Sequence, residues 1–191
     1  MFMLKRLCVT SALGLLSLSA AAEDFHSNVG TPVSTAELSK FFAILPNGTG
    51  LPPGKGTAAA GEKIYADRCA HCHGARLEGL REVGGPPLVG GRGSLATDKP
   101  LKTVESYWPY TSTLYDYIWR AMPFDQPGSL TPDAVYSLCA YILSMGKIID
   151  GKQVMDAGSL PKVVMPNVNG FYDGSDPDVE MNRSQHPGTP K

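Results

Sequence analysis

The stretch Cys69-Ala70-His71-Cys72-His73 places two thiols three positions apart and an imidazole directly after the second thiol. Each thiol can add to one vinyl group of a haem, and the imidazole that follows is then placed to ligate the iron from one face. The motif therefore predicts one covalently bound haem c, held by Cys69 and Cys72, with His73 as an iron ligand.

Two other uses of Cys-x-x-Cys have to be weighed against haem attachment. The pair could be a redox dithiol, or it could form half of a zinc site. A zinc site needs a second ligand pair at matching spacing, whereas Cys8 and Cys139 are single and far apart. Cys139 is instead expected to be a free thiol that packs as a small apolar core residue.

Residues 1–22 have the pattern of a secretory signal peptide. Lys5 and Arg6 precede an apolar run over 7–18, and Ala20 and Ala22 suit cleavage after residue 22. The apolar run is shorter than the ~20 residues that a membrane helix needs, although an uncleaved anchor stays open. We therefore expect export to the periplasm, where haem is attached to such motifs, and no membrane span after cleavage.

The charge balance of the mature chain excludes some classes of partner. Cleavage after residue 22 removes two of the 17 basic residues and none of the 18 acidic ones, which leaves a net charge of −3. There is no basic stripe that would suit nucleic acid or an anionic membrane surface. We expect neither as a partner.

Composition divides the rest of the chain into three parts. Residues 23–56 are rich in Gly, Pro, Ser and Thr and predict an N-terminal arm with at most one helical turn. Residues 57–147 carry three helical patterns and are long enough for one core. Residues 148–191 are again rich in Pro and Gly and predict a second, C-terminal arm.

Two helices are expected in the part of the domain that precedes Pro123. Thr57 suits the N-cap of a helix that runs into the Cys69 motif, and Thr111 or Ser112 suits the cap of a second helix that stops before Pro123. The second helix has apolar residues at a spacing that shares one face; these are Leu114, Tyr117, Ile118 and Ala121.

A third helix is expected from Thr131, with Pro132 at its first position, to Gly146. Its apolar residues repeat the same spacing and predict the buried face; these are Val135, Leu138, Cys139 and Ile142. Because no stretch alternates convincingly as a strand, the predicted core is all-α.

Met122 is the strongest candidate for the sixth ligand of the iron. It follows His73 by 49 residues and precedes a proline, which is far enough for the chain to reach the opposite face of the haem. A thioether is a soft ligand that favours reduced iron. The other methionines are weaker candidates, with Met165 next: Met145, Met155, Met165 and Met181. His71 lies inside the attachment loop and cannot turn back onto the iron, and His26 and His186 are expected to be surface residues.

Further residues are candidates for contacts around the haem. Pro86 follows two glycines, and its carbonyl is the natural acceptor for the second ring nitrogen of His73. Leu88 would cover the haem edge. The aromatic residues before the second helix could bond the haem propionates or simply pack in the core; these are Tyr107, Trp108 and Tyr110.

Together these motifs resemble the class I c-type cytochromes over residues 57–147. The resemblance rests on Gly61 and Tyr65, the motif that ends in His73-Gly74, the Gly85-Pro86-x-Leu88-x-Gly90 segment and Met122-Pro123. It implies a cytochrome c fold of three core helices around one haem, and electron transfer by six-coordinate iron. It also implies that Gly61 meets an aromatic residue of the last helix, either Tyr136 or Tyr141.

A narrower resemblance comes from residues 107–123 and 160–171, which look like cytochrome subunits of bacterial sulfite or sulfane dehydrogenases. It implies a molybdenum-containing dehydrogenase subunit and a downstream electron acceptor as partners, in sulfur oxidation. It also implies that the C-terminal arm over 148–191 binds the dehydrogenase subunit. Members with two haems carry a second attachment motif, which this chain lacks. Three alternatives stay open: a general soluble electron carrier, a peroxidase or thiosulfate-oxidising haem enzyme with a labile sixth ligand, and a haem-based gas sensor.

Overall fold

The computed structural model describes residues 33–34 and 44–171. The predicted signal peptide, most of the N-terminal arm and the chain after residue 171 lie outside this part, as do His26, Met181 and His186. Residues 44–171 belong to one compact unit. No helix among the described residues combines the length and the apolar character that crossing a membrane requires.

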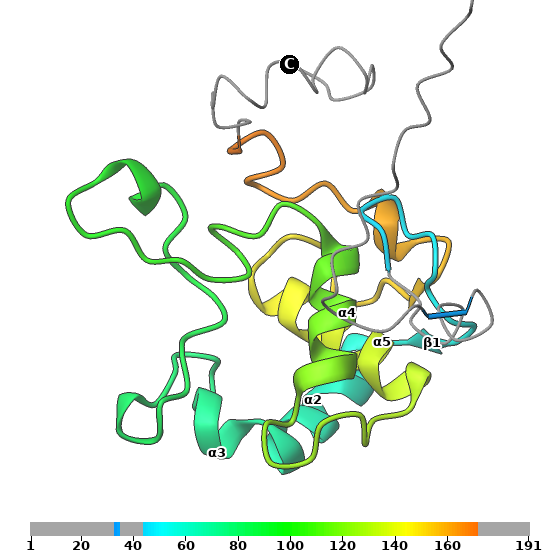
Figure 1. Cartoon of the computed structure of the whole chain (residues 1–191). Coiled ribbons are helices and arrows are strands. Elements are labelled where there is room, and N and C mark those ends of the chain that lie inside the picture. Colours follow the sequence, from blue (N-terminus) through cyan, green and yellow to red (C-terminus); the bar gives the residue numbers. More distant parts are fainter. Residues whose placement is uncertain (1–32, 35–43, 172–191) are drawn as a thin grey trace, which may run out of the picture. The chain divides into compact units, whose positions relative to one another are not determined.

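Four helices form the scaffold of the described residues, and the fold is all-α as predicted (Figure 1). They are α2 (Ala58–Arg68), α3 (Ala70–His73), α4 (Thr111–Ala121) and α5 (Pro132–Met145). Short 3-10 turns lie at Arg81–Val83, Ser94–Ala96 and Leu160–Lys162. Two strands of two residues each, β1 (Lys55–Gly56) and β2 (Met155–Asp156), pair antiparallel and join segments that the sequence assigned to separate arms.

The caps of α2 and α5 are the predicted ones. The Thr57 hydroxyl accepts a hydrogen bond from the Ala60 N–H, and the Thr131 hydroxyl accepts one from the Ala134 N–H. Each satisfies an N–H group that has no partner within the helix. The predicted apolar face of α5 is fully buried, Cys139 included, and burial raises the pKa of that thiol well above its ordinary value.

Helices α2 and α5 cross at Gly61. A side chain at Gly61 would lie 1.9 Å from the Ser137 carbonyl oxygen and 2.8 Å from Cβ of Tyr141, so only glycine allows this approach. The aromatic partner of Gly61 is therefore Tyr141. Tyr136 points elsewhere: its ring packs on Tyr115 at 4.5 Å.

The prediction for the start of α4 was wrong. Tyr110 is the N-cap residue and gives no side-chain cap. Thr111 and Ser112 lie inside the helix, where their hydroxyls donate instead to the carbonyls of Leu160 and Pro46. These two hydroxyls bind segments that are distant in the sequence, and such contacts cannot be predicted from the residues around Thr111.

The buried face of α4 is also rotated from the prediction. Tyr115 is fully buried, whereas Tyr117 is 48% exposed. Leu114 and Ile118 are buried as expected. The helical period fixes which residues share a face, but the neighbours α5 and Leu160–Lys162 decide which face is covered.

Part of the expected C-terminal arm belongs to the hydrophobic core. Met155, Leu160 and Met165 are almost completely buried and pack in the same cluster as the helices. The predicted boundary at residue 147 leaves these three side chains outside the domain whose core they help to fill. Residues 148–171 thus stabilise the fold, and any role in binding a partner stays a prediction.

Candidate haem site

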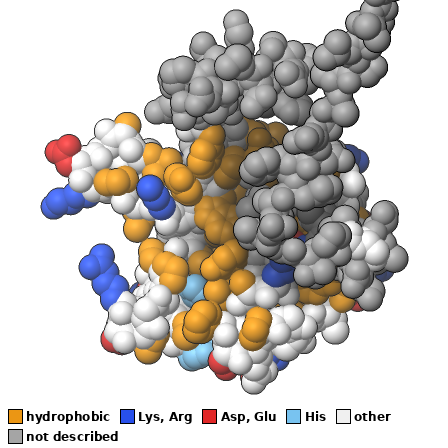
Figure 2. Space-filling model, in the orientation of Figure 1, with side chains coloured by type: hydrophobic (Ala, Val, Ile, Leu, Met, Phe, Trp, Pro, Cys, Tyr) orange, Lys and Arg blue, Asp and Glu red, His pale blue; other side chains and the backbone are white. Residues whose placement is uncertain are grey.

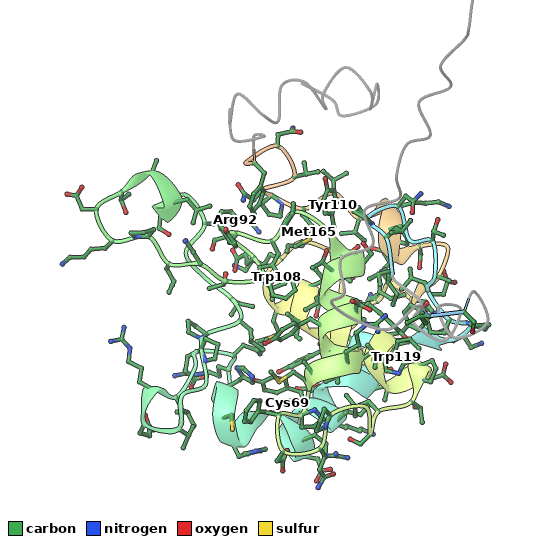
Figure 3. All side chains as sticks on the ribbon, in the orientation of Figure 1. Cys69, Arg92, Trp108, Tyr110, Trp119 and Met165 are labelled. Carbon is green, nitrogen blue, oxygen red and sulfur yellow. The ribbon has the colours of Figure 1, made fainter. Side chains whose placement is uncertain are left out.

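The two cysteines lie where α2 gives way to α3, and Figure 3 labels Cys69 at this junction. Cys69 ends α2 and begins α3, and Cys72 lies on α3 one turn later. Both cysteine side chains are half-buried, and neither forms a disulfide in the described part of the chain. Before haem is attached, burial raises the pKa of the Cys69 thiol to about 11. The helical turn thus presents both sulfur atoms from one short segment.

His73 is held by the carbonyl of Pro86. Its Nδ1 lies 2.8 Å from the Pro86 carbonyl oxygen, the contact that the sequence predicted. A carbonyl oxygen can only accept a hydrogen bond, so Nδ1 carries the proton at this contact. In a neutral imidazole with this tautomer, Nε2 carries no proton and can bind a metal ion. A hydrogen bond of this kind also fixes the ring and makes Nε2 a stronger donor.

Gly85 brings the Pro86 carbonyl into place. A side chain at Gly85 would lie 1.8 Å from the Cys72 carbonyl oxygen, so the backbone passes directly over the attachment motif. Leu80 and Gly85 form an isolated β-bridge, and the Leu80 N–H also donates to the Cys72 carbonyl at 3.1 Å. A glycine is therefore required at position 85, as the sequence suggested. In the structure, the group that lies against Gly85 is the Cys72 carbonyl.

The other predicted contact residues pack against different parts of the fold. Leu88 is half-buried against the core, and its N–H donates to the Leu77 carbonyl. Trp108, on the segment that leads into α4 (Figure 3), meets Tyr117 edge-on at 5.6 Å. Tyr107 contacts Phe171 at 5.1 Å. Figure 2 shows histidine side chains among apolar ones on this face.

Met122 ends α4. Its N–H donates to the Ile118 carbonyl, and its side chain is half-buried against the core. Pro123 is buried and Phe124 is highly exposed, with 86% of its surface accessible. Among the competing methionines that the structure describes, Met155 and Met165 are buried in the core and Met145 is 40% exposed. The ligand role of Met122 stays a prediction.

Tyr65 is the residue at this site whose role the sequence did not predict. Its hydroxyl donates to the carbonyl of Gly74, directly after His73, at 2.7 Å. A phenylalanine would suit the helical pattern equally well. The only signal in the sequence was therefore the choice of a tyrosine at a position expected to be buried.

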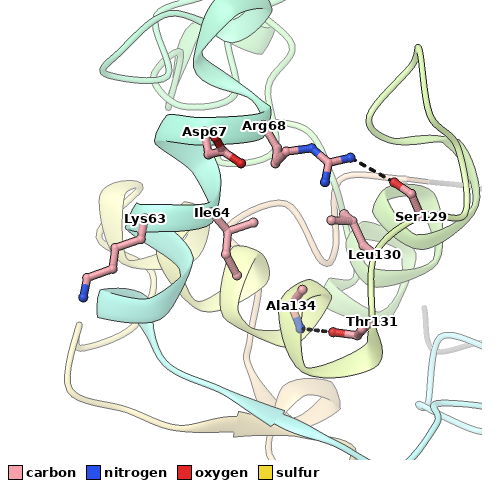
Figure 4. Close-up of a pocket in the computed structure, with 8 residues that line it drawn as sticks. All are labelled: Lys63, Ile64, Asp67, Arg68, Ser129, Leu130, Thr131 and Ala134. Atoms are coloured by element: carbon pink, nitrogen blue, oxygen red, sulfur yellow. Dashed lines mark hydrogen bonds between the residues drawn. The ribbon is translucent and has the colours of Figure 1, made fainter.

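Two further observations concern the alternatives. In the described part of the chain, no three or more His, Cys, Asp or Glu side chains converge as a zinc site would require. A pocket of ≈ 380 Å³ lies between α2 and the start of α5, lined by residues such as Lys63, Arg68 and Leu130 (Figure 4). None of the predicted haem contacts lines it, so it is separate from this site.

The donor set fits haem c. It offers two thiols one helical turn apart, an imidazole with Nδ1 held and Nε2 free, and half-buried apolar side chains nearby. Cys69 and Cys72 would hold the porphyrin, and His73 would bind the iron. These features match the requirements of covalent attachment better than those of a dithiol or a zinc site.

Comparison with known proteins agrees with a covalent haem site. A family model described as cytochrome c oxidase, cbb3-type, subunit III matches residues 56–142. The cbb3-type cytochrome c oxidase subunit FixP of Bradyrhizobium sp. (strain ORS 278) is 35% identical over 51% of this chain and 31% of its own length. The thiosulfate dehydrogenase of Psychrobacter arcticus is 26% identical over 82% of this chain and 48% of its own length. The chain thus spans a third to a half of these relatives.

A solved structure covers more of the chain. A chain in the crystal structure of the sulfane dehydrogenase SoxCD from Paracoccus pantotrophus superimposes with a TM-score of 0.70 and 38% sequence identity. The match covers 85% of this chain and 79% of that one. With its attachment motif, its helices and these relatives, the protein belongs to the class I c-type cytochromes and binds one haem c covalently.

Proposed function

We propose that this cytochrome is an electron-transfer subunit of a periplasmic, molybdenum-containing dehydrogenase that oxidises sulfite or sulfane sulfur, and that it passes single electrons to a downstream acceptor. One observation carries the proposal: the likeness to a chain of a sulfane dehydrogenase covers 85% of this chain. The haem-domain model matches only residues 56–142. The likeness to the dehydrogenase chain therefore includes segments outside the haem domain, which a general carrier has no need to share.

Haem c supplies a one-electron couple between ferric and ferrous iron. The residues of the chain that hold the haem determine which of the two oxidation states is favoured. The hydrogen bond from His73 to Pro86 strengthens the imidazole as a donor, which favours ferric iron. A thioether from Met122 on the other face would favour ferrous iron. If His73 and Met122 both hold the iron, these residues leave no position for a substrate, and the chain would transfer electrons without making or breaking a substrate bond.

A reconstituted reaction tests the proposal. The purified holoprotein is mixed with a sulfite- or sulfane-oxidising molybdenum enzyme, and haem reduction is followed by absorbance after substrate is added. An unrelated class I cytochrome serves as the control. We expect this chain to be reduced at least tenfold faster than the control at equal concentration. Equal rates would mean that the chain is a general carrier.

The role of the C-terminal arm needs a carefully placed truncation. Ending the chain at Gly151 would remove Met155, Leu160 and Met165 from the core and would test stability only. Ending it after Phe171 keeps these anchors and removes residues 172–191. If the arm docks on the partner, this shorter protein should keep its haem spectrum but accept electrons more slowly. Unchanged rates would exclude residues 172–191 from docking.

A second candidate function rests on the similarity to a thiosulfate dehydrogenase. A haem enzyme of this kind would take electrons from thiosulfate directly, through a labile sixth position. Adding thiosulfate to the isolated, oxidised holoprotein separates the two functions. Reduction without any partner would favour the enzyme, and no reduction would favour the electron-transfer subunit.

A further inference from the structure

Tyr65 links the packing of two helices to the haem-binding loop. Its side chain is 1% exposed, and its hydroxyl donates to the Gly74 carbonyl oxygen at 2.7 Å. Gly74 directly follows His73 and has a φ of 79°, in the left-handed region. Burial raises the pKa of Tyr65 well above its ordinary value, so the phenol keeps the proton that it donates.

The Tyr65 ring has little freedom to move. It packs on the ring of Tyr141 of α5 with centroids 5.3 Å apart. One turn earlier, Gly61 rests against the backbone of Ser137. The position of the hydroxyl is therefore set by the crossing of α2 and α5, the most closely packed pair of elements in the described structure.

The last two residues of the haem-binding motif and the glycine that follows have carbonyl groups that all accept hydrogen bonds. The Cys72 and His73 carbonyls accept hydrogen bonds from the backbone N–H groups of Leu80 and Gly79, at 3.1 and 2.7 Å. The Gly74 carbonyl accepts from the Leu77 N–H at a longer 3.3 Å, and from Tyr65 at 2.7 Å. Tyr65 thus provides the shorter of the two bonds at the third position, and does so from a different helix.

We propose that Tyr65 is a positioning residue for the axial histidine. It anchors the backbone immediately after His73, while Pro86 holds the ring of the same residue. The backbone and the ring must both stay in place for the Nδ1 hydrogen bond to remain short. When Tyr65 loses its hydroxyl, the His73 to Pro86 bond weakens, the imidazole becomes a poorer donor, and ferric iron loses stabilisation.

The test compares Tyr65→Phe with Tyr136→Phe in the haem-loaded protein. The two changes are closely matched: each removes a tyrosine hydroxyl that donates to a carbonyl at 2.7–2.8 Å from a fully buried, packed ring. The Tyr136 hydroxyl bonds Pro52, outside the haem-binding loop. Both variants should therefore melt at lower temperature, for the same reason.

Only Tyr65→Phe should change the axial histidine. We expect a higher reduction potential, and exchange of the His73 Nδ1 proton with solvent that is about five- to tenfold faster by proton NMR of the reduced protein. A Tyr141→Leu variant keeps the hydroxyl but frees the ring, and it should shift both quantities in the same direction by less. If Tyr65→Phe matches Tyr136→Phe in potential and in exchange rate, Tyr65 is structural only and the inference is overturned. A larger shift in Tyr141→Leu than in Tyr65→Phe would also overturn it.

Discussion

The two segments proposed to supply the axial ligands are built differently. On the His73 side, the ring and three successive carbonyls all have hydrogen-bond partners, drawn from residues 77–86 and from α2. On the Met122 side, the residue is a helix cap with one backbone hydrogen bond, and Phe124 after it is largely exposed.

The two ligand types place different demands on the residues around them. An imidazole needs a fixed tautomer and ring orientation, which only hydrogen bonds can specify. A thioether has no proton to place and offers lone pairs over a wide range of angles, so apolar packing at the end of α4 is sufficient. We infer that changes on the His73 side act on folding and haem attachment as well as on the iron, whereas changes on the Met122 side act mainly on the iron.

The largest effect is expected from Gly85→Ala, on the His73 side. The added Cβ would lie 1.8 Å from the Cys72 carbonyl oxygen, so the backbone that carries Pro86 must move. We expect the free energy of unfolding to fall by roughly 3 kcal/mol or more, together with a low yield of holoprotein.

The matched control for this change is Gly84→Ala. Gly84 has a φ of 76° but open space around its Cα, so only the backbone conformation is penalised, by about 1–2 kcal/mol. Denaturant unfolding measures both variants. A cost for Gly85→Ala no greater than that for Gly84→Ala would show that the close approach to Cys72 is unimportant.

Met122→Ala is the next largest change and tests the other side. We expect the holoprotein to fold but to lose its six-coordinate spectrum in the reduced state. The reduction potential should fall by on the order of 0.1 V, because axial ligands tune it over ~0.8 V. Met145→Ala, at the exposed end of α5, is the control and should change neither property. An unchanged potential in Met122→Ala would exclude this residue as the ligand.

Arg68→Met probes the tether of the loop that follows Met122. The Arg68 guanidinium donates to Gln126 Oε1 at 2.9 Å and to Ser129 Oγ at 3.1 Å. These bonds are close to solvent, so we expect the free energy of unfolding to fall by only about 0.5–1 kcal/mol. Lys63→Met removes the same charge from an exposed position on α2 and serves as the control. A loss above ~2 kcal/mol would mean that the Met122 side is as firmly held as the His73 side.

The smallest effect is expected from Glu78→Gln and depends on pH. Hydrogen bonds from the backbone N–H groups of Glu78 and Arg76 hold the pKa of the Glu78 carboxyl below its ordinary value. A carboxyl with a lowered folded-state pKa stabilises the fold above its ordinary pKa and loses this contribution as the pH falls through the lowered one. Wild type should therefore be slightly more stable than Glu78→Gln at neutral pH, and the difference should shrink as the pH is lowered below the ordinary pKa of a glutamate, about 4.3. A difference that stays constant in urea unfolding across this range would contradict the assignment.

Several features of the fold could be read from local sequence. Thr57, Thr131 and Gly146 act at the ends of α2 and α5 as predicted, because capping depends on residues within one turn. The contact between His73 and Pro86 was also predicted, since the glycines before Pro86 allow a close approach of the backbone.

Other features were beyond local patterns. Thr111 and Ser112 are plausible caps, yet their hydroxyls bond carbonyls 49 and 66 residues away. Met155, Leu160 and Met165 lie in a segment without helical or strand periodicity, so nothing in their spacing marks them as core residues. Each is buried by packing with residues from distant parts of the chain, which only folding brings together.

The sequence by itself determined the chemistry of this protein: covalent haem at Cys69 and Cys72, an imidazole next to them, and helices whose ends and periods are encoded locally. Tertiary structure decided the rest. It selected Tyr141 over Tyr136 as the partner of Gly61, placed Met155, Leu160 and Met165 in the core, and brought the Tyr65 hydroxyl to the Gly74 carbonyl. The physical reason is that a helical period fixes which side chains share a face, while the packing of distant segments decides what that face meets.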